Sequence, residues 1–123
     1  YFSKGEEIIM KGQLLTAILA SALVAPLASA ADADAIAKGK EIAWHRQKGN
    51  CLTCHMVEGA EMPGNVGPPL MAMKARYPNK ADLREQIWDP TARNPMTSMP
   101  PFGKNHILSE EELDLVVEYI HSL

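Results

Sequence analysis

The chain has 123 residues, enough for one small domain, and a domain of this size buries too little apolar surface to be very stable without a disulfide, a metal or a cofactor. Its formal net charge of −3, its 6% aromatic content and its lack of a long basic run argue against nucleic acid as the main partner. The two cysteines lie three positions apart, which excludes a disulfide framework between distant segments.

The N-terminal region has the pattern of a secretory signal peptide. A basic residue, Lys11, precedes an apolar stretch over residues 14–27, and Ala28 and Ala30 are the small residues of a typical cleavage site. The apolar stretch is shorter than the roughly 20 residues that cross a bilayer. We therefore expect cleavage after Ala30 rather than a permanent anchor.

These features divide the chain into three parts. Residues 1–9 precede a typical signal-peptide start and are interpreted as a leader translated from a misassigned start. Residues 10–30 are the expected signal peptide, and residues 31–123 the expected exported domain. The mature protein is expected in the periplasm, with no membrane association once the signal is removed.

The first part of the exported domain predicts a helix followed by a loop. Residues 31–48 favour helix, and Gly49 then breaks it. The small and apolar residues of this helix fall near one face: Ile36, Gly39, Ile42 and Ala43. Residues 58–70 contain three glycines and three prolines, which excludes a regular helix or a central strand and predicts an ordered loop.

Two further helices are predicted. Asn79 can cap a short helix that ends at Trp88, because the residue before Pro90 avoids the helical region. After a second loop at residues 94–105, Ser109 and Glu112 have the spacing of a capping box. The last helix then repeats apolar residues at i, i+3, i+4 and i+7, and is expected to pack on the first helix. No segment alternates apolar and polar residues, so the fold class is all-α with long loops.

The motif with the clearest chemistry is Cys51-Leu52-Thr53-Cys54-His55. In Cys-x-x-Cys-His, each thiol adds across a haem vinyl group, and the adjacent imidazole is held at the iron. A redox-active disulfide is the alternative, but such sites lie between a strand and a helix, and no strand is predicted here. A zinc site would need a fourth ligand near these three residues. We predict one covalent haem c bound through Cys51 and Cys54, with His55 as metal ligand.

The second axial ligand decides between electron transfer and ligand chemistry. Met99 is preferred, because the following Pro100-Pro101 holds the chain extended over a haem face, and Met96 is the alternative. The other methionines of the exported domain lie too near the attachment motif or are read as packing residues: Met56, Met62, Met71 and Met73. Ligation by a second histidine is a further alternative, from His45, His106 or the expected surface residue His121.

Taken together, Gly39, the Cys51–His55 motif, Gly67-Pro68-Pro69-Leu70 and a methionine before the last helix resemble a class I cytochrome c over nearly the whole exported domain. The resemblance implies a helical fold packed around one haem. It also implies that the carbonyl of a proline after glycine accepts a hydrogen bond from the ligating histidine, which would make the histidine more basic. The matching residue is Pro68 or Pro69, of which Pro68 is taken first.

Five blocks, at residues 49–51, 64–69, 86–89, 92–95 and 99–103, narrow the resemblance to the family of small SoxX subunits of the SoxAX cytochromes. The resemblance implies a heterodimer with a SoxA-type cytochrome, where thiosulfate is oxidatively joined to a cysteine of a SoxYZ carrier protein. Such a complex is an L-cysteine S-thiosulfotransferase. This chain would be its electron-accepting subunit, would not bind substrate, and would pass electrons to a soluble cytochrome c.

Two other functions fit the motifs. A free periplasmic mono-haem cytochrome c that carries electrons to an oxidase would need no permanent partner, and a haem enzyme such as a peroxidase would need an open sixth position. Charge along the sequence is also uneven. Basic residues gather in the middle of the domain, at Lys74, Arg76, Lys80, Arg84, Arg93 and Lys104, and acidic residues gather in the last helix. These residues either form an asymmetric docking face or are simply solvated.

Overall fold

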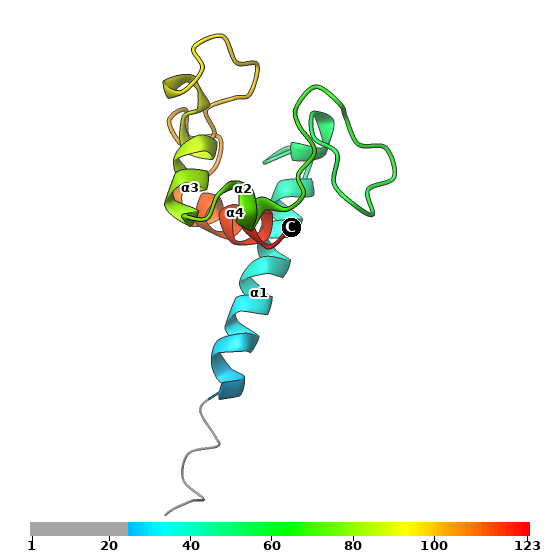
Figure 1. Cartoon of the computed structure of the whole chain (residues 1–123), viewed down its shortest axis with the longest axis vertical. Helices are drawn as coiled ribbons and strands as arrows, with labels where there is room; N and C mark the ends of the chain where they lie inside the picture. Colours follow the sequence, from blue (N-terminus) through cyan, green and yellow to red (C-terminus); the bar gives the residue numbers. More distant parts are fainter. Residues whose placement is uncertain (1–24) are drawn as a thin grey trace, which may run out of the picture. The chain divides into compact units, whose positions relative to one another are not determined.

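The computed structural model describes residues 25–123, which include a compact unit at residues 32–123. The described residues form four α-helices and two 3-10 turns and contain no strand, which confirms the all-α class (Figure 1). The helices are α1 (Ala25–Trp44), α2 (Met73–Arg76), α3 (Lys80–Trp88) and α4 (Glu110–Ser122), and the turns are η1 (Cys51–Thr53) and η2 (Pro90–Ala92).

The predicted leader at residues 1–9 and residues 10–24 of the predicted signal peptide lie outside the described residues. Cleavage after Ala30 falls within α1 and stays a prediction. Between residues 25 and 123, no helix is both long enough and apolar enough to cross a membrane.

Helix α1 ends at Trp44, four residues before the predicted end at Lys48. The carbonyl of His45 accepts hydrogen bonds from the amides of Lys48 (3.0 Å) and Asn50 (3.1 Å), so the chain reverses here. The prediction of a longer helix was wrong, because helix propensity describes single residues and does not include the hydrogen bonds of this turn. The turn carries the chain back from the end of α1 to the two cysteines.

Helix α4 forms the centre of the core. The Ser109 hydroxyl accepts a hydrogen bond from the Glu112 amide, and the Glu112 carboxylate accepts one from the Ser109 amide, both at 3.1 Å, which confirms the capping box. Its predicted apolar face is buried: Leu113, Val116, Val117 and Ile120. Helix α1 packs on it as predicted, and a Cβ at Gly39 would lie 1.9 Å from the Leu115 carbonyl oxygen, so this crossing requires glycine.

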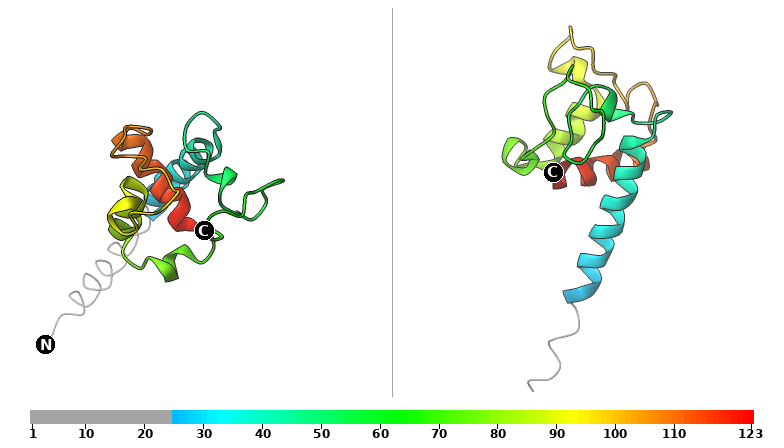
Figure 2. Two further views of the ribbon diagram at one scale, coloured as in Figure 1. Left: turned by 90° about the horizontal axis from the view of Figure 1, so that it is seen from above. Right: turned by 90° about the vertical axis from the view of Figure 1, so that its right-hand side faces the viewer.

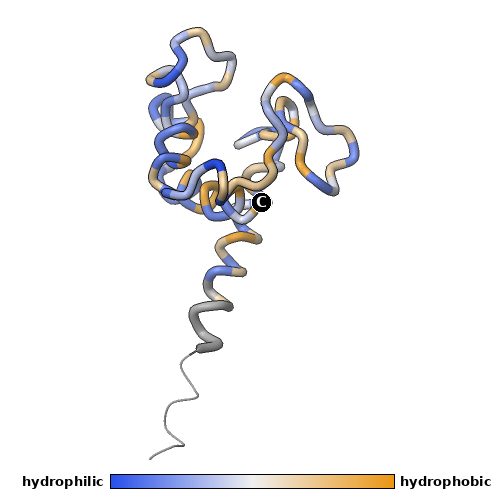
Figure 3. The backbone as a smooth tube through the Cα atoms, viewed as in Figure 1, coloured by the Kyte–Doolittle hydropathy of each residue, from blue (hydrophilic) through white to orange (hydrophobic). Residues whose placement is uncertain are grey.

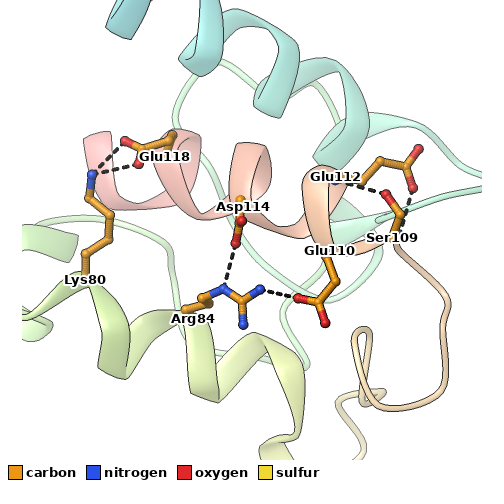
Figure 4. Close-up of polar contacts among 7 residues, drawn as sticks. All are labelled: Lys80, Arg84, Ser109, Glu110, Glu112, Asp114 and Glu118. Atoms are coloured by element: carbon orange, nitrogen blue, oxygen red, sulfur yellow. Dashed lines mark hydrogen bonds and ion pairs between the residues drawn. The ribbon is translucent and has the colours of Figure 1, made fainter.

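Helix α3 lies beside α4 and is joined to it by ion pairs (Figure 4). The Asn79 side chain accepts a hydrogen bond from the Ala81 amide at 3.1 Å, which confirms the predicted cap. Lys80 pairs with Glu118 at 2.7 Å, and Arg84 pairs with Asp114 at 2.6 Å and also with Glu110. Basic and acidic groups that are separate in the sequence are therefore adjacent in space, and the ion pairs argue against two separate charged faces.

Two loops rise on the same side of this helical base (Figures 1 and 2). We call residues 55–72 the proximal loop and residues 93–108 the distal loop. Apolar residues occur along both loops as well as in the helices (Figure 3). The short helix α2 follows the proximal loop, and η2 precedes the distal loop. Neither was predicted, since three or four residues are too few to show a period.

Candidate functional site

A cavity of about 720 Å³ lies between the two loops and the helices. Cys51, Cys54, His55 and Pro68 line it on the proximal side, and Met96 and Met99 come from the distal loop. Buried apolar residues from the helices and the distal loop also line it: Met73, Leu83, Ile87, Leu108, Val116 and Ile120. The structure therefore brings the haem-attachment motif, Pro68 and both preferred methionine candidates together, in a cavity of the size and apolar character typical of a cofactor site.

The turn η1 places both thiols and the imidazole in this cavity. Asn50 enters the turn in the left-handed conformation (φ 49°), and the Cys51 carbonyl accepts hydrogen bonds from the amides of Cys54 (3.2 Å) and His55 (2.9 Å). Neither cysteine is in a disulfide. Burial raises the pKa of the Cys51 thiol to about 11. A redox-active cysteine has a lowered pKa, so this environment disfavours the disulfide alternative.

The imidazole of His55 is held by the proximal loop. Its Nδ1 lies 2.7 Å from the Pro68 carbonyl oxygen, which identifies Pro68 rather than Pro69 as the acceptor. This bond leaves Nε2 as the nitrogen that can ligate a metal. Gly67 lies against the same ring, and a Cβ there would be 2.4 Å from His55 Cε1. The loop therefore forms a close-fitting support that fixes the ring.

The proximal loop is itself tied to the cysteine motif. Backbone hydrogen bonds run from Gly64 to Leu52 (2.7 Å), from Gly67 to Cys54 (2.7 Å) and from Leu70 to Met56 (2.8 Å). Sequence reasoning missed one further contact, in which the guanidinium of Arg76 donates to the Pro69 carbonyl at 2.7 Å. Its signal in the sequence is no more than a basic residue seven positions after a diproline.

The two candidate methionines differ in how deeply they are buried. Met99 is half-buried and packs against the core, whereas Met96 is 90% exposed although it also lines the cavity. This difference favours Met99. The cavity lining does not include Met56, Met62 or Met71.

The other histidines do not line the cavity: His45, His106 and His121. Their positions argue against a second histidine ligand. The prediction that His121 is a surface residue was wrong, because it is half-buried and its Nε2 lies 3.0 Å from the Tyr77 carbonyl oxygen, with which it forms a hydrogen bond. Within residues 25–123, no three His, Cys, Asp or Glu side chains form a metal-binding group.

Comparison with known proteins assigns the family, since residues 36–123 match cytochrome c. The chain belongs to the cytochrome c family. Membership implies a covalently attached haem c and a role in electron transfer. The residues fit this group, because one apolar cavity holds two neighbouring thiols, an imidazole oriented by a carbonyl, and a half-buried thioether.

A relative is found in Aquifex aeolicus (strain VF5). It is described as an uncharacterized lipoprotein and is 32% identical over 76 residues, which are 61% of this chain. The matched stretch covers 37% of that protein's length, so this chain corresponds to little more than a third of it.

Proposed function

We propose that the chain is the electron-accepting subunit of a SoxAX-type cytochrome complex. The observation that carries the proposal is that the two candidate axial ligands, His55 and Met99, line one cavity from two different loops. The five sequence blocks that resemble SoxX supply the choice of complex.

Each site residue has a proposed role. Cys51 and Cys54 form the thioether bonds, His55 Nε2 and Met99 Sδ bind the metal, and the Pro68 carbonyl orients the imidazole. When bound, the haem supplies an iron that holds one electron. With both the imidazole and the thioether bound, the iron would have no position left for substrate, and the thioether would favour the reduced state.

The chemistry of the proposed complex sets what this chain must do. Joining thiosulfate to a carrier-protein thiol forms one sulfur–sulfur bond and releases two electrons and one proton. The bond forms between thiosulfate and the SoxYZ cysteine at the SoxA subunit, and this chain accepts the electrons one at a time and passes them to a soluble cytochrome c. Both of its cysteines belong to the haem motif, so neither can carry the sulfur substrate. The chain is thus part of an L-cysteine S-thiosulfotransferase without binding substrate.

The surface around the mouth of the cavity supports the proposal of a permanent partner. Val66, Met96 and Ile107 are exposed apolar residues that line it, and exposed apolar surface around a functional cavity is typical of an interface. We propose that a SoxA-type subunit covers this rim in a heterodimer. The family and the description of the Aquifex relative as a lipoprotein support an extracytoplasmic location, for which we propose the periplasm.

The proposal is tested by co-expression with a SoxA-type partner under conditions of haem maturation, followed by purification through a tag on one chain. We expect a one-to-one complex, a mass for this chain that includes one haem, and haem reduction that requires thiosulfate and SoxYZ together. A chain that purifies alone, stays oxidised with thiosulfate and SoxYZ, and is reoxidised by a terminal oxidase would instead be a free electron shuttle.

Two equally exposed methionines provide a matched pair of variants for the partner surface. Met96 lines the cavity and Met62 does not, and each is 90% exposed. Met96→Glu should weaken the complex, because it places a charge in the proposed interface, while Met62→Glu should leave it intact. Equal affinities for the two variants would contradict the proposed surface.

A further inference from the structure

We infer that Arg76 is a positioning residue for the haem-ligating histidine, and that it acts through the Pro68-Pro69 dipeptide. The inference rests on the proposed role of His55 as metal ligand and is independent of the SoxAX assignment. Arg76 is the last residue of α2 and lines the cavity. Its Nη1 donates to the Pro69 carbonyl at 2.7 Å and lies 3.3 Å from the sulfur of Met73, which is 2% exposed.

The diproline depends on such a contact because neither proline has an N–H group. The backbone amides on either side are engaged, that of Gly67 with the Cys54 carbonyl and that of Leu70 with the Met56 carbonyl. Between them, only carbonyl oxygens remain to hold the dipeptide. The Pro68 oxygen is bonded to His55, and the Pro69 oxygen to Arg76.

Peptide geometry links these two carbonyls. The Pro69 oxygen and the Leu70 amide belong to one planar peptide unit, which is held at both ends, by Arg76 and by the Met56 carbonyl. The Pro68 oxygen belongs to the preceding planar unit. Because the ring of Pro69 fixes φ, a single torsion, ψ of Pro69, connects the two units. Holding the second plane therefore restricts the direction in which the Pro68 carbonyl faces the imidazole.

The chemistry of arginine suits this role. A guanidinium is always protonated and is a donor only, so its bond to the carbonyl is charge-assisted and persists at any pH at which the protein is folded. A residue that orients the hydrogen-bond partner of a metal-ligating histidine affects the basicity of the imidazole without touching the metal. Loss of Arg76 should thus weaken the hydrogen bond between the His55 ring and the Pro68 carbonyl, while His55 and Pro68 themselves stay in place.

The test measures solvent exchange of the His55 ring N–H by NMR in the haem-loaded protein. In Arg76→Met, which keeps much of the side-chain length but no donor, exchange should be about fivefold faster than in the parent protein. Arg76→Lys keeps a charge and a single donor and should restore most of the protection. The visible spectrum and circular dichroism check that each variant is folded and loaded.

Lys74→Met is the matched control. Lys74 lies on the same helix, does not line the cavity, and forms no side-chain hydrogen bond or ion pair among the described residues. Lys74→Met removes one positive charge, as Arg76→Met does, and the exchange rate of the His55 ring N–H should stay within twofold of that in the parent protein. Equal exchange in Arg76→Met and the parent, or equal acceleration in Arg76→Met and Lys74→Met, would overturn the inference. A parent protein with no protected ring N–H would show that His55 does not hold a lasting bond to the Pro68 carbonyl, and would overturn the inference while leaving the ligand role of Nε2 unaffected.

Discussion

The proximal and distal loops line the same cavity, but they are held in different ways. The proximal loop is joined to the cysteine motif by two backbone hydrogen bonds and closed on itself by a third, and its Pro68 carbonyl contacts the His55 ring. In the distal loop, the hydrogen bonds around the candidate ligand are local. Asn94 accepts from the Met96 amide and Thr97 from the Met99 amide, each within two residues and at 3.1 Å.

This difference indicates that contacts within the polypeptide hold His55 in position more firmly than they hold Met99. The Pro68 carbonyl holds the ring of His55, and the backbone of Gly67 lies directly against that ring. Met99 is placed by a local turn and by packing against the core. We therefore expect the distal ligand to be the one that exchanges or is displaced first, and the histidine to stay in place.

The largest effect is expected from Met99→Ala. The haem should stay bound through the two thioethers, while the far-red sulfur-to-iron band disappears and the reduction potential falls by about 0.1 V or more, since axial ligands set haem potentials over a wide range. Spectroscopy and redox titration measure both. Met96→Ala is the control, because Met96 is 90% exposed and should change neither. If Met96→Ala removes the band instead, the distal ligand has been misassigned.

A smaller effect is expected from Gly67→Ala on the proximal side. The added Cβ would lie 2.4 Å from His55 Cε1, so the ring or the loop must shift, at a cost of about 1–3 kcal/mol in the free energy of unfolding. Denaturant titration measures that cost, and the His55 ring signals should move.

Gly59→Ala is the control on the same loop. Gly59 has a φ of 80° with no atom near an added Cβ, so this variant should lose roughly 1 kcal/mol through backbone strain alone, with unchanged His55 signals. Unchanged ring signals in Gly67→Ala would show that the proximal loop yields more readily than its hydrogen bonds indicate.

The sequence predicted the helices better than the loops, for a physical reason. Asn79 and Ser109 cap their helices through local contacts, and the spacing of apolar residues in α4 reports directly which face is buried. Such signals lie within a few residues of one another. The end of α1 was misplaced because it depends on a turn around His45.

In the site, the sequence identified the residue types but not the contacts between them. The choice between Pro68 and Pro69 depends on which carbonyl faces an imidazole 13 or 14 positions earlier, and this is set by non-local hydrogen bonds of the proximal loop. For the same reason, Arg76 was grouped with basic residues that either form a docking face or are simply solvated, and its bond to the Pro69 carbonyl was not predicted. Lys80 and Arg84 contact acidic residues that lie 26 to 38 positions away, which no local pattern indicates.

The smallest effect is expected at Asp89, which lies just before the distal loop and contacts Lys104 within it. Its carboxylate accepts hydrogen bonds from the Thr91 amide at 3.1 Å and from the Lys104 ammonium at 2.7 Å. The Lys104 ammonium first, and then the Thr91 hydroxyl, which also donates to this carboxylate, hold the pKa of Asp89 below its ordinary value of 3.8. A lowered pKa in the folded state means that the stabilisation is present above pH 3.8 and is lost as the pH falls through the folded-state pKa.

Asp89→Asn should therefore lower the denaturation midpoint at pH 5 to 7, and the difference from the parent should shrink as the pH falls below about 3.8. The far-red band of the same samples reports whether Met99 is released as this contact weakens. Glu58→Gln is the control: Glu58 is an exposed carboxylate of the proximal loop that forms no ion pair among the described residues, and this variant should keep a denaturation midpoint close to that of the parent. If acid releases Met99 equally in the parent and in Asp89→Asn, the distal loop is held by its core contacts rather than by this ion pair.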